Sequence, residues 1–268
     1  MDFIERYDGS GLMISVKRKI AEAKGIQKIE IYETESFGKM LVIDGKIQLT
    51  EFDEHFYHEM LVHVPMNSCK RAKKVLIIGG GDGGALREVL KHDIERAVLV
   101  EIDRNVINLC REHLGIDCGA FEDPRVEIVI EDGRKFLEHC EKFDVIIVDS
   151  TDPVGVSDPL FGKDFFELCD EKCTVFCSQA QSPLIQKNYF RKLLENSSPL
   201  KNRAMFLATI PTYPMALWSF IIAGEYDFRF IRRNFRKIKG KTKHYNPEVH
   251  LSAFMLPEWL KKEVENAY

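Results

Sequence analysis

Residues 75–89 pass from an apolar segment through a run of glycines into an amphipathic segment. This pattern predicts a strand, a tight loop and a helix. Glycines at 79, 81 and 84 have the G-x-G-x-x-G spacing of a nucleotide-binding βαβ unit, in which missing side chains let a ligand approach the backbone at the helix N-terminus. Many unrelated sites share this spacing, so other residues must indicate which ligand binds.

A carboxylate, Asp82, lies inside this glycine loop. A phosphate bound about 4 Å from it would be repelled by about 1 to 4 kcal/mol. The ligand is therefore expected to lack phosphate and to carry a cation. Glu101 ends the next apolar segment, where an acidic residue accepts hydrogen bonds from ribose hydroxyls. An adenosine with a cationic tail indicates S-adenosylmethionine or a relative of it.

Length and charge exclude several classes of protein. A chain of 268 residues can hold one large domain, alone or with an appendage, and 38 basic against 42 acidic residues give a net charge of −4. No overall basic field favours nucleic acid. The N-terminus lacks the pattern of a signal peptide, and no segment has the roughly 18 apolar residues that cross a membrane. The sequence predicts a soluble cytoplasmic protein without a membrane partner.

The cysteines predict reduced thiols. They are seven in number and contain no C-x-x-C pair, as expected in a reducing cytosol. Cys169, Cys173 and Cys177 have a spacing that suggests a metal site, but they straddle a predicted helix end, turn and strand, and no histidine pair joins them. No metal is expected.

Residues 1–60 are predicted to form a small β domain, with a catalytic domain at 61–268. Residues 26–33 alternate, 40–43 are apolar, and Asp44-Gly45 predicts a type I′ turn before 46–50. Gln27 and Gln48 are polar strand positions that face either solvent or a ligand, and strand statistics favour solvent.

Residues 53–64 have a helical pattern. Phe56, Met60 and Val64 fall on one face, which we assign to the core. Tyr57 and His58 lie off that face, where isolated residues are more often surface groups than ligands.

From residue 74 the pattern alternates between strands and helices. Strands are predicted at 75–78, 97–101, 126–130, 144–149, 174–178, 204–210 and 218–223, and helices at 84–91, 104–113, 133–140, 163–169 and 186–195. This order predicts a Rossmann-like α/β fold, with a mostly parallel sheet covered by helices on both faces. The turn at 211–214 predicts that the last strand returns antiparallel. Residues 150–162 are long for a plain connection and are expected to gate the site.

Ligands of open α/β sheets bind at the carboxyl ends of the strands. The residues at those ends are mostly acidic or amide-bearing: Asp82, Glu101, Asp132 with Gly133, Asp149 with Asp152, and Gln179 with Gln181. Asp132 could equally serve only as a helix N-cap. Several carboxylates in one crevice would raise one another's pKa values, so their convergence predicts positively charged substrates.

The sequence resembles the aminopropyltransferases of the spermidine synthase family. The matching motifs follow the family order from about residue 27 to 257, nearly the whole chain: 41–51 (Leu-Val-Ile-Asp-Gly-Lys-Ile-Gln-Leu-Thr-Glu), 53–60 (Asp-Glu-x-x-Tyr-His-Glu-Met), 79–84 (Gly-Gly-Gly-Asp-Gly-Gly), 100–103 (Val-Glu-Ile-Asp), 131–133 (Glu-Asp-Gly), 149–153 (Asp-Ser-Thr-Asp-Pro), 211–214 (Pro-Thr-Tyr-Pro) and 245–250 (Tyr-Asn-Pro-Glu-Val-His). Together they are far more specific than a glycine loop.

The resemblance implies that decarboxylated S-adenosylmethionine is the aminopropyl donor, a co-substrate rather than a cofactor. Glu101 would bind its ribose, Asp132 with Gly133 its adenine, and Asp82 its amine. Gln27 and His58 would complete the donor site.

For the acceptor amine, the resemblance implies that Asp149 is the general base, assisted by Tyr57 and Tyr213, with Asp152 and Gln181 in the acceptor site. It also implies a homodimer or homotetramer with contacts through the N-terminal β domain.

The chain departs from the family pattern near the acceptor. Many members carry a glutamate in the segment where this chain has Gln181, and Met215-Ala216 replace the usual glycine or serine. Putrescine is the expected acceptor, while agmatine, cadaverine and longer polyamines remain open.

Parts of the sequence are compatible with two other functions. A methyltransferase would have to accommodate the carboxylate of intact S-adenosylmethionine, for which Asp82 is poorly placed. An RNA-binding module could use the basic residues of 229–243, interleaved with Phe228, Phe230 and Phe235. A helix with a solvated basic face is the preferred interpretation of that segment, since the chain is net acidic.

Overall fold

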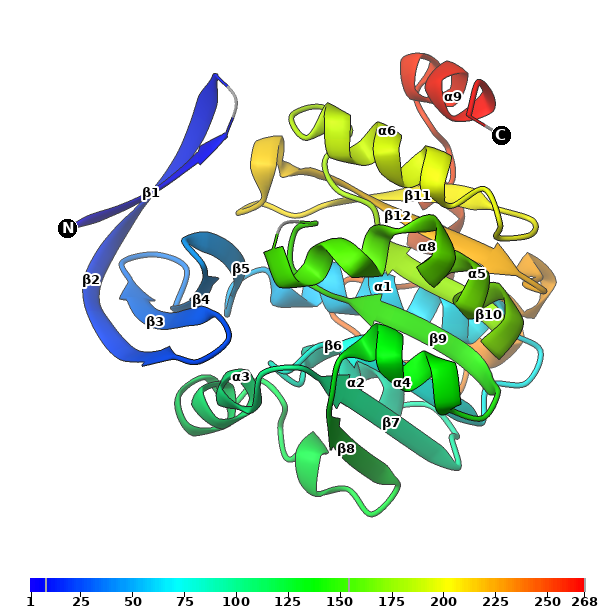
Figure 1. Ribbon diagram of the computed structural model, residues 1–268, viewed down its shortest axis with the longest axis horizontal. Helices are drawn as coiled ribbons and strands as arrows, with labels where there is room; N and C mark the ends of the chain where they lie inside the picture. Colours follow the sequence, from blue (N-terminus) through cyan, green and yellow to red (C-terminus); the bar gives the residue numbers. More distant parts are fainter. Residues whose placement is uncertain (8, 154, 268) are drawn as a thin grey trace.

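The computed structural model describes residues 1–7, 9–153 and 155–267, which form two β-sheets with helices (Figure 1). The N-terminal sheet is antiparallel, with its five strands side by side in chain order: β1 (Asp2–Tyr7), β2 (Ser10–Lys24), β3 (Lys28–Thr34), β4 (Lys39–Ile43) and β5 (Lys46–Thr50). Asp44 (φ 50°) and Gly45 (φ 78°) connect β4 to β5, as the predicted type I′ turn requires. The small N-terminal β domain is confirmed.

The second sheet has seven strands in the order β11-β12-β10-β9-β6-β7-β8. Their bounds are β6 (Lys74–Gly79), β7 (Arg96–Glu101), β8 (Val126–Ile130), β9 (Phe143–Asp149), β10 (Cys173–Gln179), β11 (Ala204–Thr209) and β12 (Leu217–Gly224). β6 to β10 are parallel, and β12 runs antiparallel to both of its neighbours. The predicted Rossmann-like sheet and its antiparallel return are confirmed. The strand order reverses at β6 and β9, where a ligand crevice is expected.

Both faces of this sheet are covered, because successive side chains of a strand point to opposite sides. Val75 and Ile77 pack toward α1 (Glu54–Ser68), α2 (Gly84–Leu90) and α8 (Pro247–Ala253). Leu76 and Ile78 pack toward the helices of the other face. These are α4 (Gly133–His139), α5 (Lys163–Lys172), α6 (Lys187–Asn196) and α9 (Glu258–Glu265).

The two sheets are joined through α3 (Arg104–Leu109). Apolar side chains of β3 and β4, such as Ile31 and Leu41, share a core with Val106 of α3 and with Leu114. The remaining short helices are η1 (Cys110–Leu114), η2 (Ala120–Glu122), η3 (Gly155–Phe161), η4 (Pro214–Ala216) and η5 (Phe228–Phe230). This packing places the N-terminal sheet at the carboxyl ends of β6 and β7.

Helix α1 is buried along almost its whole length. Met60 and Val64 lie in the core as expected, and Phe56 packs against it. Tyr57 and His58, which the helical pattern left outside the core face, are buried as well. The domain boundary predicted at residue 60 falls inside this helix, and the division into two domains stays a prediction.

The basic segment differs from the expected helix. α7 covers only Ile231–Phe235, and turns follow it. The buried carboxylate of Glu59 accepts hydrogen bonds from the backbone N–H groups of Lys243, His244 and Tyr245, which fixes that stretch in a non-helical path on α1. The helical interpretation of 229–243 is therefore wrong beyond α7.

Among the described residues, no helix combines the length and apolar character needed to cross a membrane. All seven cysteines are free, as the sequence predicted.

Candidate active site

Two adjoining cavities open at the carboxyl ends of the central strands. The larger, about 850 Å³ including its mouth, is lined by every residue predicted for the donor: Gln27, His58, Asp82, Glu101, Asp132 and Gly133. The smaller, about 360 Å³, is lined by Asp152. Tyr57 and Tyr213 line both cavities, so the two spaces meet at these rings.

The three glycines of the loop each leave room for a specific neighbour. A Cβ at Gly79 (φ 81°) would lie 2.1 Å from the carbonyl oxygen of Asp149. A Cβ at Gly81 would lie 2.8 Å from Oε2 of Glu101, and one at Gly84 would lie 2.3 Å from the His58 ring. The three glycines therefore allow the backbone of Asp149 and the side chains of Glu101 and His58 to lie directly against the loop.

Glu101 is held at the end of β7 by two backbone donors. The N–H groups of Gly81 and Asp103 donate to its carboxylate over 3.2 and 3.0 Å. Burial raises its pKa to about 7, although these hydrogen bonds favour ionisation. The carboxylate lines the larger cavity, where it can accept hydrogen bonds from a diol.

Asp132 is both a helix cap and a cavity residue. Its Oδ1 accepts from the N–H groups of Arg134 and Lys135 over 2.9 and 3.1 Å, which makes it the N-cap of α4. The two interpretations of Asp132 are thus compatible. Gly133 lines the same cavity and also allows close packing, because a Cβ there would lie 2.2 Å from Ile78.

Gln48 of β5 and Gln27 both line the larger cavity, so the solvent interpretation favoured by strand statistics is wrong. Gln27 lies between β2 and β3 rather than on a strand, where the sequence predicts it. Gln27 is buried and donates from Nε2 to Asp44 over 3.2 Å. The backbone carbonyl of Gln48 accepts a hydrogen bond of 2.5 Å from the hydroxyl of Tyr213. The N-terminal sheet therefore supplies one wall of the site.

A buried acidic cluster lies at the junction of the cavities. The Tyr57 hydroxyl donates to Oδ1 of Asp149 over 2.9 Å. Burial and the Asp82 carboxylate raise the pKa of Asp149 to about 6, while the His58 imidazolium and the Tyr57 hydroxyl act in the opposite direction. Burial also opposes ionisation of Asp82, but His58, 3.4 Å away, lowers the pKa of Asp82 below its usual value.

His58 has a carboxylate near each ring nitrogen. Nδ1 lies 2.8 Å from Glu54, and Nε2 lies 3.4 Å from Asp82 and 4.0 Å from Asp149. Burial opposes the charged ring, yet the carboxylates of Asp82 and Glu54 raise the pKa of His58 well above its ordinary value. These two contacts favour the protonated form of the ring.

Among the described residues, His58, Asp82 and Asp149 are the group whose spacing resembles that of metal ligands. The expectation that no metal binds stays a prediction. Cys169, Cys173 and Cys177 form no such group in the described chain.

The predicted acceptor residues divide between two places. Asp152 lines the smaller cavity, where Gln186 donates to it over 2.9 Å, and burial raises its pKa to about 6. Gln181 lines neither cavity. Its amide donates instead to Gln179, which does line the smaller one. Gln181 therefore lies behind Gln179, which lines the smaller cavity.

Sequence reasoning missed several residues of the smaller cavity: Glu5, Lys46, Gln186 and Trp218. Glu5 lies on β1, which carries no clear strand pattern, and the carboxyl-end rule does not extend to the N-terminal sheet.

The DP-loop, which we define as residues 150–162, includes residue 154 outside the described chain. Within it, the hydroxyls of Thr151 and Ser157 are 2.6 Å apart, and Pro159 and Leu160 line the larger cavity.

Comparisons with known proteins identify the family of the chain. The spermine/spermidine synthase domain model matches residues 54–233, and the spermidine synthase tetramerisation domain model matches residues 1–51. A polyamine aminopropyltransferase of Archaeoglobus fulgidus is 70% identical over 263 residues, which cover 98% of each chain. One from Thermoanaerobacter sp. is 42% identical over 271 residues, 97% of this chain and 96% of the relative.

Solved structures give the same result. A spermidine synthase in complex with the transition-state analogue AdoDATO superposes with a TM-score of 0.93 at 38% identity, covering 99% of this chain and 95% of that one. The spermidine synthase of Thermotoga maritima superposes with a TM-score of 0.91 at 38% identity, covering 99% of this chain and 94% of that one. The chain therefore belongs to the spermine/spermidine synthase family.

Proposed function

We propose that this enzyme transfers the aminopropyl group of decarboxylated S-adenosylmethionine to putrescine, giving spermidine and methylthioadenosine. The larger cavity takes the donor and the smaller one the acceptor. The observation that carries the proposal is the position of Asp149, a carboxylate of the larger cavity that accepts a hydrogen bond from Tyr57, whose ring lines both cavities.

Asp149 acts as the general base. An alkylamine with a pKa near 10 is mostly protonated at neutral pH, and a protonated nitrogen has no lone pair. Asp149 removes a proton from the acceptor ammonium, and the neutral nitrogen attacks the methylene carbon next to the sulfonium. The new C–N bond forms as the C–S bond breaks, and the electron pair of that bond returns to sulfur.

The leaving group needs no acid, because methylthioadenosine departs as a neutral thioether. Acidic groups lower the repulsion between two cationic substrates and hold them in line, which accounts for much of the rate increase. Asp82 binds the donor amine, Glu101 its ribose, and Asp132 its adenine amino group. These assignments rest on the positions of the three carboxylates around one cavity.

The smaller cavity supports a short diamine as acceptor. Asp152 gives it a carboxylate for the far ammonium, and Glu5 adds a second acidic group that is paired with Lys46 at 3.3 Å. Gln179 and Gln186 also line this cavity and provide side-chain amides for hydrogen bonding. A longer polyamine would have to extend past Asp152 into the neighbouring groove lined by Arg6 and Lys187, where it meets positive charge.

The test is product analysis with the decarboxylated donor and putrescine, cadaverine, agmatine and spermidine as acceptors. We expect methylthioadenosine in amounts equal to the new polyamine, with putrescine giving the highest kcat/KM. Methyl transfer from intact S-adenosylmethionine, with no methylthioadenosine from the decarboxylated donor, would refute the proposal and favour a methyltransferase.

We also propose a homotetramer. The N-terminal residues match a model described as a tetramerisation domain, and Ile4 and Met13 expose apolar surface on the paired strands β1 and β2. Light scattering after gel filtration should give four times 31.0 kDa. Ile4→Lys should lower that mass, and a monomer for the unmodified chain would contradict the proposal.

A further inference from the structure

Glu54 is a buried carboxylate that lines neither cavity. It lies in the first turn of α1, and its Oε2 is 2.8 Å from Nδ1 of His58. The same oxygen accepts a hydrogen bond of 2.8 Å from Arg87 of α2. Glu54 therefore stands directly behind a histidine that faces the substrates.

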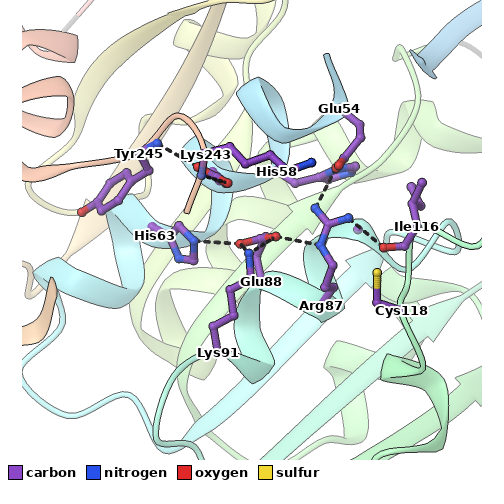
Figure 2. Close-up of polar contacts among 12 residues, drawn as sticks. Glu54, His58, His63, Arg87, Glu88, Lys91, Ile116, Cys118, Lys243 and Tyr245 are labelled. Atoms are coloured by element: carbon purple, nitrogen blue, oxygen red, sulfur yellow. Dashed lines mark hydrogen bonds and ion pairs between the residues drawn. The ribbon is translucent and has the colours of Figure 1, made fainter. Parts of the chain in front are cut away.

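Arg87 is itself held in place, as Figure 2 shows. Its guanidinium donates to the carbonyl of Ile116 and to Glu88, each over 2.7 Å. Glu88 is completely buried and also pairs with His63 at 2.8 Å. This bridge between α1 and α2 fixes the Glu54 carboxylate, because Arg87 cannot turn away without losing three acceptors.

The front of the His58 ring faces the catalytic acids. Glu54 and Tyr57 approach it from α1, Asp82 from the loop after β6, and Asp149 from the end of β9, while Arg87 acts on it through Glu54. One ligand-type atom from each of His58, Asp82 and Asp149 lies within 4.8 Å of the others. Two carboxylates this close and buried would share a proton unless a cation lay beside them.

We infer that Glu54 is a positioning residue that holds His58 as an imidazolium, and that this charge keeps Asp149 ionised and able to accept a proton at neutral pH. The inference rests on the proposed role of Asp149. Glu54 stabilises the cation from behind, Arg87 fixes Glu54, and Gly84 leaves the space that the ring occupies, since a Cβ there would lie 2.3 Å from it.

The charges of the bridge are consistent with this role. Burial opposes ionisation of Glu54, but His58 and Arg87 lower its pKa to about 2. The carboxylate therefore stays charged throughout the working pH range. Removing that charge should release the proton of His58 and raise the pKa of Asp149.

The test compares Glu54→Gln, which keeps the shape and removes the charge, with Glu54→Asp, which keeps the charge and shortens the side chain. The acidic limb of the plot of kcat against pH reports the pKa of the general base in the enzyme–substrate complex. In Glu54→Gln we expect this limb to move to higher pH by about one unit or more, with activity recovering above pH 8. Glu54→Asp should keep the limb of the unmodified enzyme.

Glu59→Gln is the matched control. Glu59 is a buried glutamate of the same helix, and within the described chain its carboxylate accepts hydrogen bonds from the backbone N–H groups of residues 243–245. Its replacement should lower stability without moving the acidic limb. An equal shift in Glu59→Gln would overturn the inference, because the effect would then come from loosening α1.

Nitrogen NMR of His58 gives a readout that does not depend on turnover or on a folded variant. In the unmodified enzyme at pH 7 both ring nitrogens should be protonated, and a neutral ring would overturn the inference by itself. If Asp149→Asn stayed active while His58 was charged, the proposed function of Asp149 would fail and the charge state assigned to His58 would stand.

Discussion

The hydroxyl of Tyr57 donates to Oδ1 of Asp149, and Oδ2 of the same carboxylate has no hydrogen-bond partner among the described residues. Oδ2 lies beside Gly80, where a Cβ would come within 3.1 Å of it. One oxygen is therefore fixed and the other is left to accept a proton. A carboxyl pKa of about 6 is close to neutral pH, as a general base requires.

Replacing the proposed base, Asp149, should remove turnover and spare donor binding. Asp149→Asn keeps the volume of the side chain but cannot take a proton, so we expect kcat to fall by about 100- to 10,000-fold. Calorimetry should show donor affinity unchanged, because the donor contacts assigned above do not use Asp149. Asp158→Asn, an exposed change in the DP-loop, serves as the control and should keep full activity. An Asp149→Asn enzyme with most of its rate would require another base.

Asp82 should discriminate between ligands with and without an amine. Asp82→Asn removes a buried carboxylate that would pair with the donor ammonium, so donor affinity should fall by about 30-fold or more. Methylthioadenosine lacks the aminopropyl arm, and its affinity should stay the same. The two affinities can be measured by calorimetry on one preparation. An equal loss for both ligands would mean that the substitution disturbs the loop and that Asp82 does not bind the amine.

Glu101 should make nucleoside binding depend on pH. Its pKa in the folded protein is raised to about 7 by burial, so the group is mostly protonated below pH 7 and ionised above it. In the proposed donor site the carboxylate would accept hydrogen bonds from two ribose hydroxyls, whereas the protonated acid would accept fewer. Affinity for methylthioadenosine should therefore rise as the pH increases through 7, and calorimetry from pH 5.5 to 8.5 would measure it. Affinity that is flat over this range would contradict the assignment.

The same shift predicts the pH dependence of stability. A carboxyl whose pKa is higher in the folded than in the unfolded chain binds its proton more tightly when folded. The unfolding free energy should therefore fall as the pH rises from the unfolded pKa of Glu101 toward its folded value of about 7. Denaturant titrations of the unmodified enzyme and Glu101→Gln should differ in slope over this interval. Parallel curves would show that Glu101 is not shifted.

The strands around the glycine loop could be predicted because their signal is local. Predicted and observed bounds of β6 to β9 differ by one residue at most, since each is a short apolar segment between turn residues. β2 was not separated from its surroundings, because most of its 15 residues are not buried and pairing with β1 and β3 holds it in place. The helix expected over 229–243 was lost to contacts with Glu59, which no local pattern records.

For the site, too, residues with a local sequence signal could be predicted and residues placed by long-range packing could not. The carboxyl-end rule found Asp82, Glu101 and Asp149, since a parallel sheet places those ends together. It could not find Glu54 or Arg87, whose side chains meet across 33 residues of sequence through the packing of α1 on α2. It named both Gln179 and Gln181, and the family resemblance then selected Gln181, but Gln179 is the one that lines the smaller cavity. A strand end fixes the position of a residue but not the direction of its side chain.

Two glycines with similar backbone angles separate the cost of conformation from the cost of contact. Gly79 (φ 81°) and Gly45 (φ 78°) both adopt the left-handed region that side chains disfavour. A Cβ at Gly45 meets nothing within 4 Å, so Gly45→Ala should lower the unfolding free energy by only about 1 to 2 kcal/mol. At Gly79 the same atom would lie 2.1 Å from the backbone oxygen of Asp149, which cannot rotate away.

Gly79→Ala should therefore cost clearly more than Gly45→Ala, and it should also separate the loop after β6 from the end of β9. Denaturant unfolding of both variants measures the difference in stability, and kcat for whatever fraction stays folded measures the effect on the site. Because Asp149 is the last residue of β9, kcat should fall in Gly79→Ala and remain unchanged in Gly45→Ala. Equal stabilities would mean that β6 and β9 can part at their carboxyl ends without strain, and the close approach would then not be what requires glycine at position 79.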